Sequence, residues 1–215
     1  MKDIEKPVTF DTTLKQLIKT HLNDPSFSHS NWGDSDLLPV RTHIRNHYGP
    51  LQKYKCYYCR EKLSRRSTCN RQVEHIVCKS EYEKFMFEPK NMILICSDCN
   101  EIKGSTKVTK KEKIKNYPRS SNAFTIVHPH FDKWDTYLHI TKAGHYVGKD
   151  DLGKKKGSTT IMVFGLNRRL DELNITKNGD VNEKFFEMAR QLADGMSDNE
   201  KALFVGNLSQ AVYRP

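Results

Sequence analysis

The chain of 215 residues is long enough to bury a hydrophobic core without help from disulfides or metal ions. Its composition, 36% hydrophobic and 29% charged, excludes the disordered and membrane-embedded classes. No apolar run reaches the roughly 18 residues that a membrane span needs, and no hydrophobic stretch follows the first six residues. We therefore expect a cytoplasmic protein with no membrane partner.

The formal net charge of +10 is concentrated in one part of the chain. Residues 41–120 contain 19 lysines and arginines against 8 aspartates and glutamates, which leaves a net charge of +11. A basic segment of this kind indicates a polyanionic partner such as DNA or RNA. The plainer alternative is that these side chains only solvate a surface.

Residues 1–50 are expected to form a helical N-terminal region. Asp11 can cap a first helix, in which leucine and isoleucine recur at helical spacing. Pro39 can open a second helix, which Gly49-Pro50 would close. Nothing in the first forty residues indicates chemistry. His43 and His47, four residues apart on the second helix, could bind a metal ion, but with no third ligand nearby we favour a solvated or phosphate-facing surface.

Residues 51–120 contain the motifs and end in a basic tail. From Lys103 to Arg119 the sequence is rich in lysine and poor in apolar residues, so it could follow a phosphate backbone. We assign nucleic-acid contacts to Lys103, Lys107, Lys110 and Lys111.

Residues 121–215 are expected to form a mixed α/β extension. Residues 136–140 and 145–147 predict a short hairpin, and residues 159–164 predict a strand or the start of a buried helix. Two helices are expected to follow, one capped by Asp180 and one opened by the capping box Ser197-Asp198-Asn199-Glu200.

His128, His130 and Asp132 form a separate polar group just before the predicted hairpin. They could supply metal ligands or phosphate donors. Turn chemistry explains Pro129 and Asp132 equally well, so both interpretations stay open.

Four of the six cysteines form two Cys-x-x-Cys pairs, Cys56/Cys59 and Cys96/Cys99, with 36 residues between the pairs. Each pair makes a tight turn that presents two thiolates, and two such turns complete a tetrahedral Zn²⁺ site with no open position. A closed site is structural, so we predict a zinc ion that braces the fold. Redox-active dithiols are the alternative.

Between the two pairs, an apolar run around Glu74 and His75 predicts a short strand that places a carboxylate beside an imidazole. After the second pair, Asn100 stands on a predicted short helix that Ser97 or Asp98 can cap. Since the second cysteine pair lies at the start of this helix, zinc would clamp the helix against the strand.

These residues resemble the HNH endonuclease family over about residues 54–106, a quarter of the chain. The matching elements are Glu74-His75, Asn91 and Asn100, with eight residues between the two asparagines, which is the spacing usual in that family. The resemblance implies an α+β fold in which a ββα-metal core is braced by the four-cysteine site.

The resemblance also implies a role for each residue. His75 would be the general base that deprotonates water, Asn91 would orient its imidazole through a hydrogen bond, and Glu74 and Asn100 would hold one divalent cation. A neutral imidazole can accept that proton, and a hard cation such as Mg²⁺ prefers carboxylate and amide oxygens.

The motif departs from the common family pattern at two positions. Glu74 stands where aspartate is frequent, which relaxes the expected choice between Mg²⁺ and Mn²⁺. Asn100 stands where many members have a second histidine, which disfavours softer metals at the catalytic position.

We therefore expect an endonuclease that hydrolyses phosphodiester bonds in DNA. Two alternatives remain: a zinc-dependent adaptor that binds nucleic acid without catalysis, and an HNH nuclease that cleaves RNA such as tRNA.

The rest of the chain resembles small HNH proteins of bacterial anti-phage systems, of the Septu type and of some retrons, which act beside an ATPase. The matching features are Glu74-His75-Ile76, His128-Pro129 and Asp132 before the hairpin, and Gly165-Leu166-Asn167-Arg168. The resemblance implies an effector nuclease with an ATPase partner, which would dock on the terminal helices.

Overall fold

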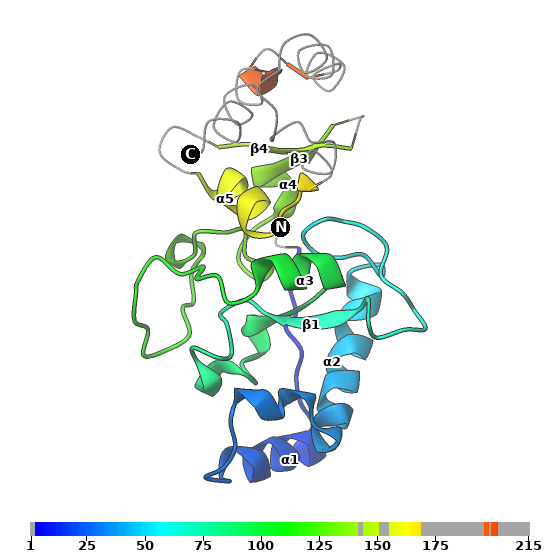
Figure 1. The fold of residues 1–215 in the computed structure, drawn as a ribbon, viewed down its shortest axis with the longest axis vertical. Coiled ribbons are helices and arrows are strands. Elements are labelled where there is room, and N and C mark those ends of the chain that lie inside the picture. The colour runs from blue at the N-terminus through cyan, green and yellow to red at the C-terminus, as the bar shows by residue number, and fades with distance from the viewer. Residues whose placement is uncertain (1–2, 142–143, 151–154, 169–195, 198, 202–215) are drawn as a thin grey trace. The chain divides into compact units, whose positions relative to one another are not determined.

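The structure is a computed structural model that describes residues 3–141, 144–150, 155–168, 196–197 and 199–201 (Figure 1). The chain divides into two compact units, the first comprising Met1–Phe124 with His128–Asp132 and the second comprising Thr125–Val127 with Lys133–Pro215. The fold is mixed α+β, as predicted, and its strands form two separate antiparallel pairs.

The elements of the first unit follow one another along the chain. Its α-helices are α1 (Thr12–Leu22), α2 (Leu38–Leu51) and α3 (Ser97–Lys103), and its strands are β1 (Gln72–His75) and β2 (Met92–Ile95). Short 3-10 helices connect them: η1 (His29–Gly33), η2 (Ser35–Leu37), η3 (Glu83–Phe85), η4 (Pro89–Asn91) and η5 (Ser121–Ala123).

Both predicted N-terminal helices are present. The Asp11 side chain caps α1 by accepting a hydrogen bond from the Leu14 amide at 2.8 Å. The predicted end of α2 is wrong, because the helix continues through Gly49-Pro50 to Leu51. Pro50 has no amide hydrogen to donate to the Asn46 carbonyl, but a helical bond beyond it is present, from the Gln52 amide to the Tyr48 carbonyl at 2.8 Å.

Residues 1–50 belong to the same compact unit as both cysteine pairs. Val40, Ile44 and Tyr48 on one face of α2 are completely buried. The Tyr48 hydroxyl accepts a hydrogen bond from the Val8 amide and donates one to the Pro89 carbonyl, both at 3.0 Å. Helix α2 is therefore part of the core of the first unit.

Strands β1 and β2 pair in a register that sets Glu74 opposite Ile93 and His75 opposite Met92. Every residue of β2 is buried, so both faces of this strand are covered. Helix α3 begins two residues after β2 and lies alongside β1 (Figure 1). The two strands and the helix form a β-β-α arrangement.

A side chain covers the outer edge of β2. The buried Gln52 donates from Nε2 to the Leu94 carbonyl at 2.8 Å and accepts from the Leu94 amide at 3.0 Å through Oε1. The same Nε2 donates to the Lys55 carbonyl at 2.8 Å. Gln52 therefore joins the end of α2, the strand and the first cysteine loop.

The second unit contains the predicted hairpin, formed by β3 (Leu138–Ile140) and β4 (Tyr146–Gly148), with α4 (Trp134–Tyr137) before it. Residues 159–164 are mostly helical, within α5 (Lys156–Val163). Gly157 allows α5 to approach the hairpin, because a Cβ there would lie 2.2 Å from the Tyr137 carbonyl oxygen.

The C-terminal capping box is partly visible. The Ser197 amide donates to the Glu200 carboxylate at 2.9 Å, as a capping box requires. The predicted helix after Asp180 lies outside the described residues. In the part of the chain that is described, no helix combines the length and apolar character needed to cross a membrane.

Candidate functional site

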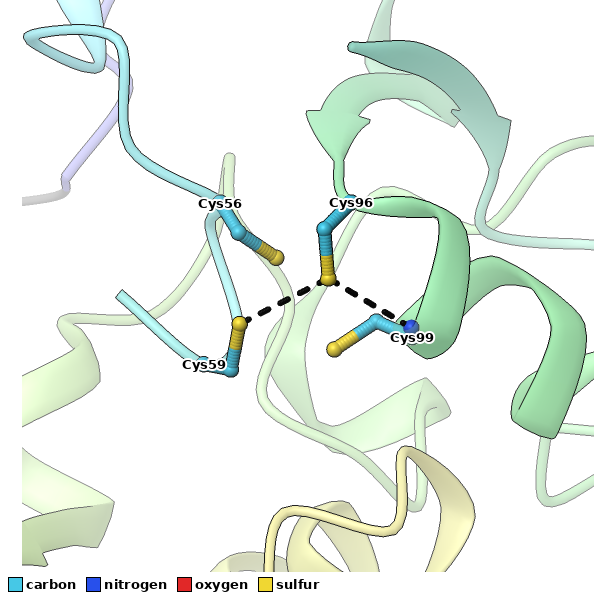
Figure 2. Close-up of side chains that lie close together, drawn as sticks. All are labelled: Cys56, Cys59, Cys96 and Cys99. Atoms are coloured by element: carbon cyan, nitrogen blue, oxygen red, sulfur yellow. Dashed lines mark hydrogen bonds between the residues drawn. The ribbon is translucent and has the colours of Figure 1, made fainter. Parts of the chain in front are cut away.

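The four cysteines of the two pairs come together in one buried cluster. The sulfur atoms of Cys56, Cys59, Cys96 and Cys99 all lie within 4.8 Å of one another. Figure 2 shows these side chains pointing toward a common centre, two from a loop and two from the start of α3. The predicted grouping of these cysteines is confirmed, and four thiols at this spacing could hold a metal ion such as zinc.

Backbone hydrogen bonds shape both cysteine turns. In the first, the Cys56 amide donates to the Glu61 carbonyl at 2.8 Å, and Arg60 adopts a left-handed backbone conformation with φ of 59°. In the second, Cys96 is the N-cap of α3, and its sulfur accepts from the Cys99 amide at 3.5 Å. The cluster therefore fixes the beginning of α3.

The thiols also act on one another. The sulfurs of Cys59 and Cys96 lie 3.6 Å apart (Figure 2). Hydrogen bonds from Cys56, and then from Cys59 and Cys99, lower the pKa of Cys96. A thiol with a lowered pKa is partly thiolate, and thiolate is the form that binds metal.

Strand β1 presents polar side chains toward α3 on one face. The amide of Asn100 donates to the side-chain carbonyl of Gln72, and the ammonium of Lys103 lies 2.5 Å from Glu74 Oε1. Gln72 and Glu74 are two residues apart, so strand alternation places them on the same face. Two polar contacts thus connect β1 with α3.

Glu74 and Lys103 form a buried ion pair. Their side chains are 6% and 1% exposed, and the ammonium also donates to the carbonyls of His75 at 3.2 Å and Gly104 at 3.4 Å. Burial raises the pKa of Glu74, and the charge of Lys103 acts against that rise. Among the residues described, no further donor reaches Glu74 Oε1.

His75 lies on the other face of β1 and is 5% exposed. Its Nε2 is 3.0 Å from the Met86 carbonyl, and its ring meets the Trp32 ring edge-on at a centroid distance of 4.5 Å. A carbonyl can only accept, so Nε2 carries the proton and Nδ1 is the basic nitrogen. Burial lowers the pKa of His75 to about 3, and the imidazole is therefore neutral at neutral pH.

Asn91 is completely buried, and its side-chain hydrogen bonds go to groups other than the His75 imidazole. Its Oδ1 accepts from the Val77 amide at 2.7 Å, and its Nδ2 donates to the carbonyls of Val77 and Phe85, each at 3.0 Å. The predicted hydrogen bond from Asn91 to the imidazole is wrong. Asn91 instead fixes the backbone that follows β1, while the Met86 carbonyl holds the histidine ring.

The predicted basic residues do not share one environment. Lys107, Lys110 and Lys111 are exposed, as a phosphate contact requires. Lys103 is buried against Glu74, and its side chain is closed off from any phosphate at the surface. The position of Lys103 one helical turn after Asn100 brings it to β1 rather than to solvent.

The polar group at residues 128–132 has a structural role. His128 Nε2 lies 2.8 Å from the Tyr117 hydroxyl, and Asp132 accepts from the His128 amide at 2.7 Å. His130 Nε2 bonds the Met92 carbonyl at 3.0 Å, which attaches this turn to β2. The turn interpretation of Asp132 agrees with these bonds. Among the described residues, the four cysteines are the one group of three or more His, Cys, Asp or Glu side chains that could hold a metal ion.

Sequence reasoning missed Gln72 and Trp32. The alternation of β1 contained a signal for Gln72, since it shares a face with Glu74. No local pattern pointed to Trp32, because its contact with His75 spans 43 positions of the chain.

Comparisons with models of known protein families, with curated proteins and with solved structures find no match to this chain.

Proposed function

We propose that this protein is a divalent-metal-dependent endonuclease of the HNH type, which hydrolyses phosphodiester bonds in DNA. The observation that carries the proposal is the β-β-α arrangement of β1, β2 and α3, in which Glu74 and His75 end one strand and Asn100 stands on the helix. The cysteine cluster at the start of α3 would bind zinc and brace this arrangement.

His75 would act as the general base. Its Nδ1 is unprotonated and has no hydrogen-bond partner among the described groups, while Nε2 is occupied by the Met86 carbonyl. Water attacking phosphorus would transfer a proton to Nδ1, and the bond from phosphorus to the leaving oxygen would break. The fixed tautomer orients the ring for that transfer.

In this proposal, Glu74 and Asn100 would hold a hard divalent cation. Glu74 and Asn100 offer a carboxylate and an amide oxygen, and Glu74 Oε1 has no partner besides the Lys103 ammonium in the described structure. A Mg²⁺ or Mn²⁺ ion bound there would neutralise charge on the scissile phosphate and the leaving oxygen. Lys103 would keep the Glu74 carboxylate directed along the face of β1.

The test is cleavage of supercoiled plasmid by the purified full chain in Mg²⁺ or Mn²⁺. We expect His75→Ala to abolish nicking while the zinc content remains as in the wild type and the protein stays folded at the assay temperature. His139→Ala, which removes a histidine of the second unit, is the matched control and should cut normally. Equal cutting by wild type and His75→Ala would refute the role of His75.

A zinc-dependent adaptor that only binds nucleic acid is the second candidate. The burial of both Glu74 and His75 favours it, since a catalytic pair must reach its substrate. This candidate predicts salt-sensitive DNA binding and no cleavage product with any divalent ion. Parallel digests of plasmid, single-stranded DNA and total RNA would show whether an RNA such as tRNA is the target.

The proposal extends to a defence complex. If the chain is the effector of an anti-phage system, we expect it to co-purify with a large ATP-binding protein. Full activity of the isolated monomer, unchanged by that partner, would count against this part of the proposal.

A further inference from the structure

Three arginines of the first unit carry positive charge without a carboxylate partner. They are Arg45 on α2 and Arg65 and Arg71 in the segment before β1, and we call them the arginine cluster. The ion pairs within the described chain use other cations, namely His29, Arg60, Lys103 and Arg119. Within the described residues, no carboxylate therefore forms an ion pair with the arginine cluster.

Carbonyls and a ring hold the cluster in place. Arg45 Nε donates to the Arg71 carbonyl at 3.2 Å, and Arg71 Nη1 donates to the Arg65 carbonyl at 3.2 Å. The Arg65 guanidinium stacks over the Tyr54 ring at 4.5 Å from its centroid. These contacts leave the terminal nitrogens of Arg45 without a hydrogen bond to the described chain.

The surroundings of Arg45 are electropositive. Burial, and then the charges of Arg41 and Arg71, lower the pKa of Arg45, and no acidic group opposes them. Arg41 itself is engaged with the carbonyls of Trp32, Gly33 and Asp34. Like charges held together in this way favour an anionic ligand, and the planar guanidinium fork matches the geometry of a phosphate.

The cluster lies beside the predicted catalytic strand. Arg71 immediately precedes β1 and is four residues before His75, a span of about 13 Å in an extended strand. This span is on the order of a few nucleotides along one nucleic-acid strand.

We propose that the arginine cluster binds the phosphodiester backbone of the nucleic acid a few nucleotides away from the phosphate that is cleaved. This inference rests on the proposed function and locates its substrate on the molecule. It assigns the main backbone contact to arginines before β1 rather than to the lysines after α3.

The test is the affinity of the zinc-loaded full chain for a short fluorescein-labelled DNA duplex, measured by anisotropy over a range of salt concentrations without divalent ions. For Arg45→Gln/Arg71→Gln we expect roughly 10- to 100-fold weaker binding and a salt slope smaller by about 2, one for each lost contact. Lys107→Gln/Lys111→Gln removes the same charge elsewhere and should change both quantities less.

A charge-preserving variant separates binding from structure. Arg45→Lys/Arg71→Lys should retain most of the affinity and the salt slope if phosphate binding is the role of the cluster. If the lysine and glutamine variants lose affinity equally, or if the glutamine variant keeps the wild-type slope, the inference is overturned. It is also overturned if the wild type does not bind the duplex.

Failure of the proposed binding site can be told apart from failure of the proposed nuclease activity. If the Arg45→Gln/Arg71→Gln variant has a smaller salt slope but the wild type never cuts DNA, the binding site is supported and the proposed nuclease activity is refuted. Cleavage that depends on His75, with a normal salt slope in the glutamine variant, would support the nuclease and refute the binding site.

Discussion

The cysteine cluster and the Glu74-His75 strand differ in how their polar atoms are satisfied. The four thiols face one another inside the protein, and their geometry could accommodate a metal ion without reference to any other residue. Glu74 and His75, in contrast, are held by Lys103 and by the Met86 carbonyl. A metal site can therefore be recognised from geometry alone, whereas the chemistry of the strand has to be tested by substitution.

The largest expected effect comes from the cysteine side of this comparison. We expect Cys96→Ser to abolish zinc binding and to destabilise the first unit, because a structural zinc contributes on the order of 10 kcal/mol of binding free energy. Elemental analysis and thermal unfolding would measure both losses. Cys69→Ser, at an exposed cysteine outside the cluster, is the control and should leave one zinc per chain.

The next effect concerns the buried ion pair. Lys103→Met leaves Glu74 buried without its partner, so we expect the free energy of unfolding to fall by about 3–5 kcal/mol in chemical denaturation. The double variant Glu74→Gln/Lys103→Met should recover much of that loss. A Lys103→Met protein as stable as Lys107→Met would show that the ion pair does not stabilise the fold.

The buried side chain of His130 predicts an acid-sensitive stability. Burial lowers the pKa of His130 to about 4 from 6.5, so the unfolded chain binds the proton more readily between these pH values. The contribution of His130 to the free energy of unfolding is fully present above about pH 6.5. It decreases as the pH falls from there through 4, by at most about 3 kcal/mol. Chemical denaturation across this pH range should show that the free energy of unfolding of His130→Gln depends less steeply on pH than that of the wild type.

The smallest expected effect is that of removing the ring beside His75. We expect Trp32→Ala to cost about 1–2 kcal/mol of stability and to raise the pKa of His75 from about 3 toward 6.5, because the imidazole becomes more hydrated. NMR titration of the histidine would measure the shift. His29→Ala, in the same 3-10 helix, should leave the His75 titration unchanged.

Short-range signals in the sequence predicted a substantial part of this structure. The spacing of the cysteine pairs predicted their cluster, Asp11 predicted the start of α1, and residues 136–147 predicted the hairpin. Each of these predictions depends on residues close together in the sequence or on a side chain with one strong chemical preference, as cysteine has for metal ions.

Contacts between distant segments were not predictable. Trp32 meets His75, and Gln52 meets Leu94, across more than 40 positions. The helical state of residues 159–163 depends on a tertiary bond as well, because Thr160 Oγ1 accepts from the Val127 amide at 2.8 Å while donating to the Lys156 carbonyl at 2.7 Å. Packing of this kind overrides the strand preference of β-branched residues.

The glutamine at the edge of β2 has a further consequence for association between molecules. A two-stranded sheet exposes edges on which another chain could add a strand. At Leu94 both backbone groups are already occupied by the Gln52 side chain, and the Tyr57 amide approaches the same carbonyl at 3.2 Å. This edge is therefore closed to edge-to-edge aggregation by one buried amide rather than by a third strand.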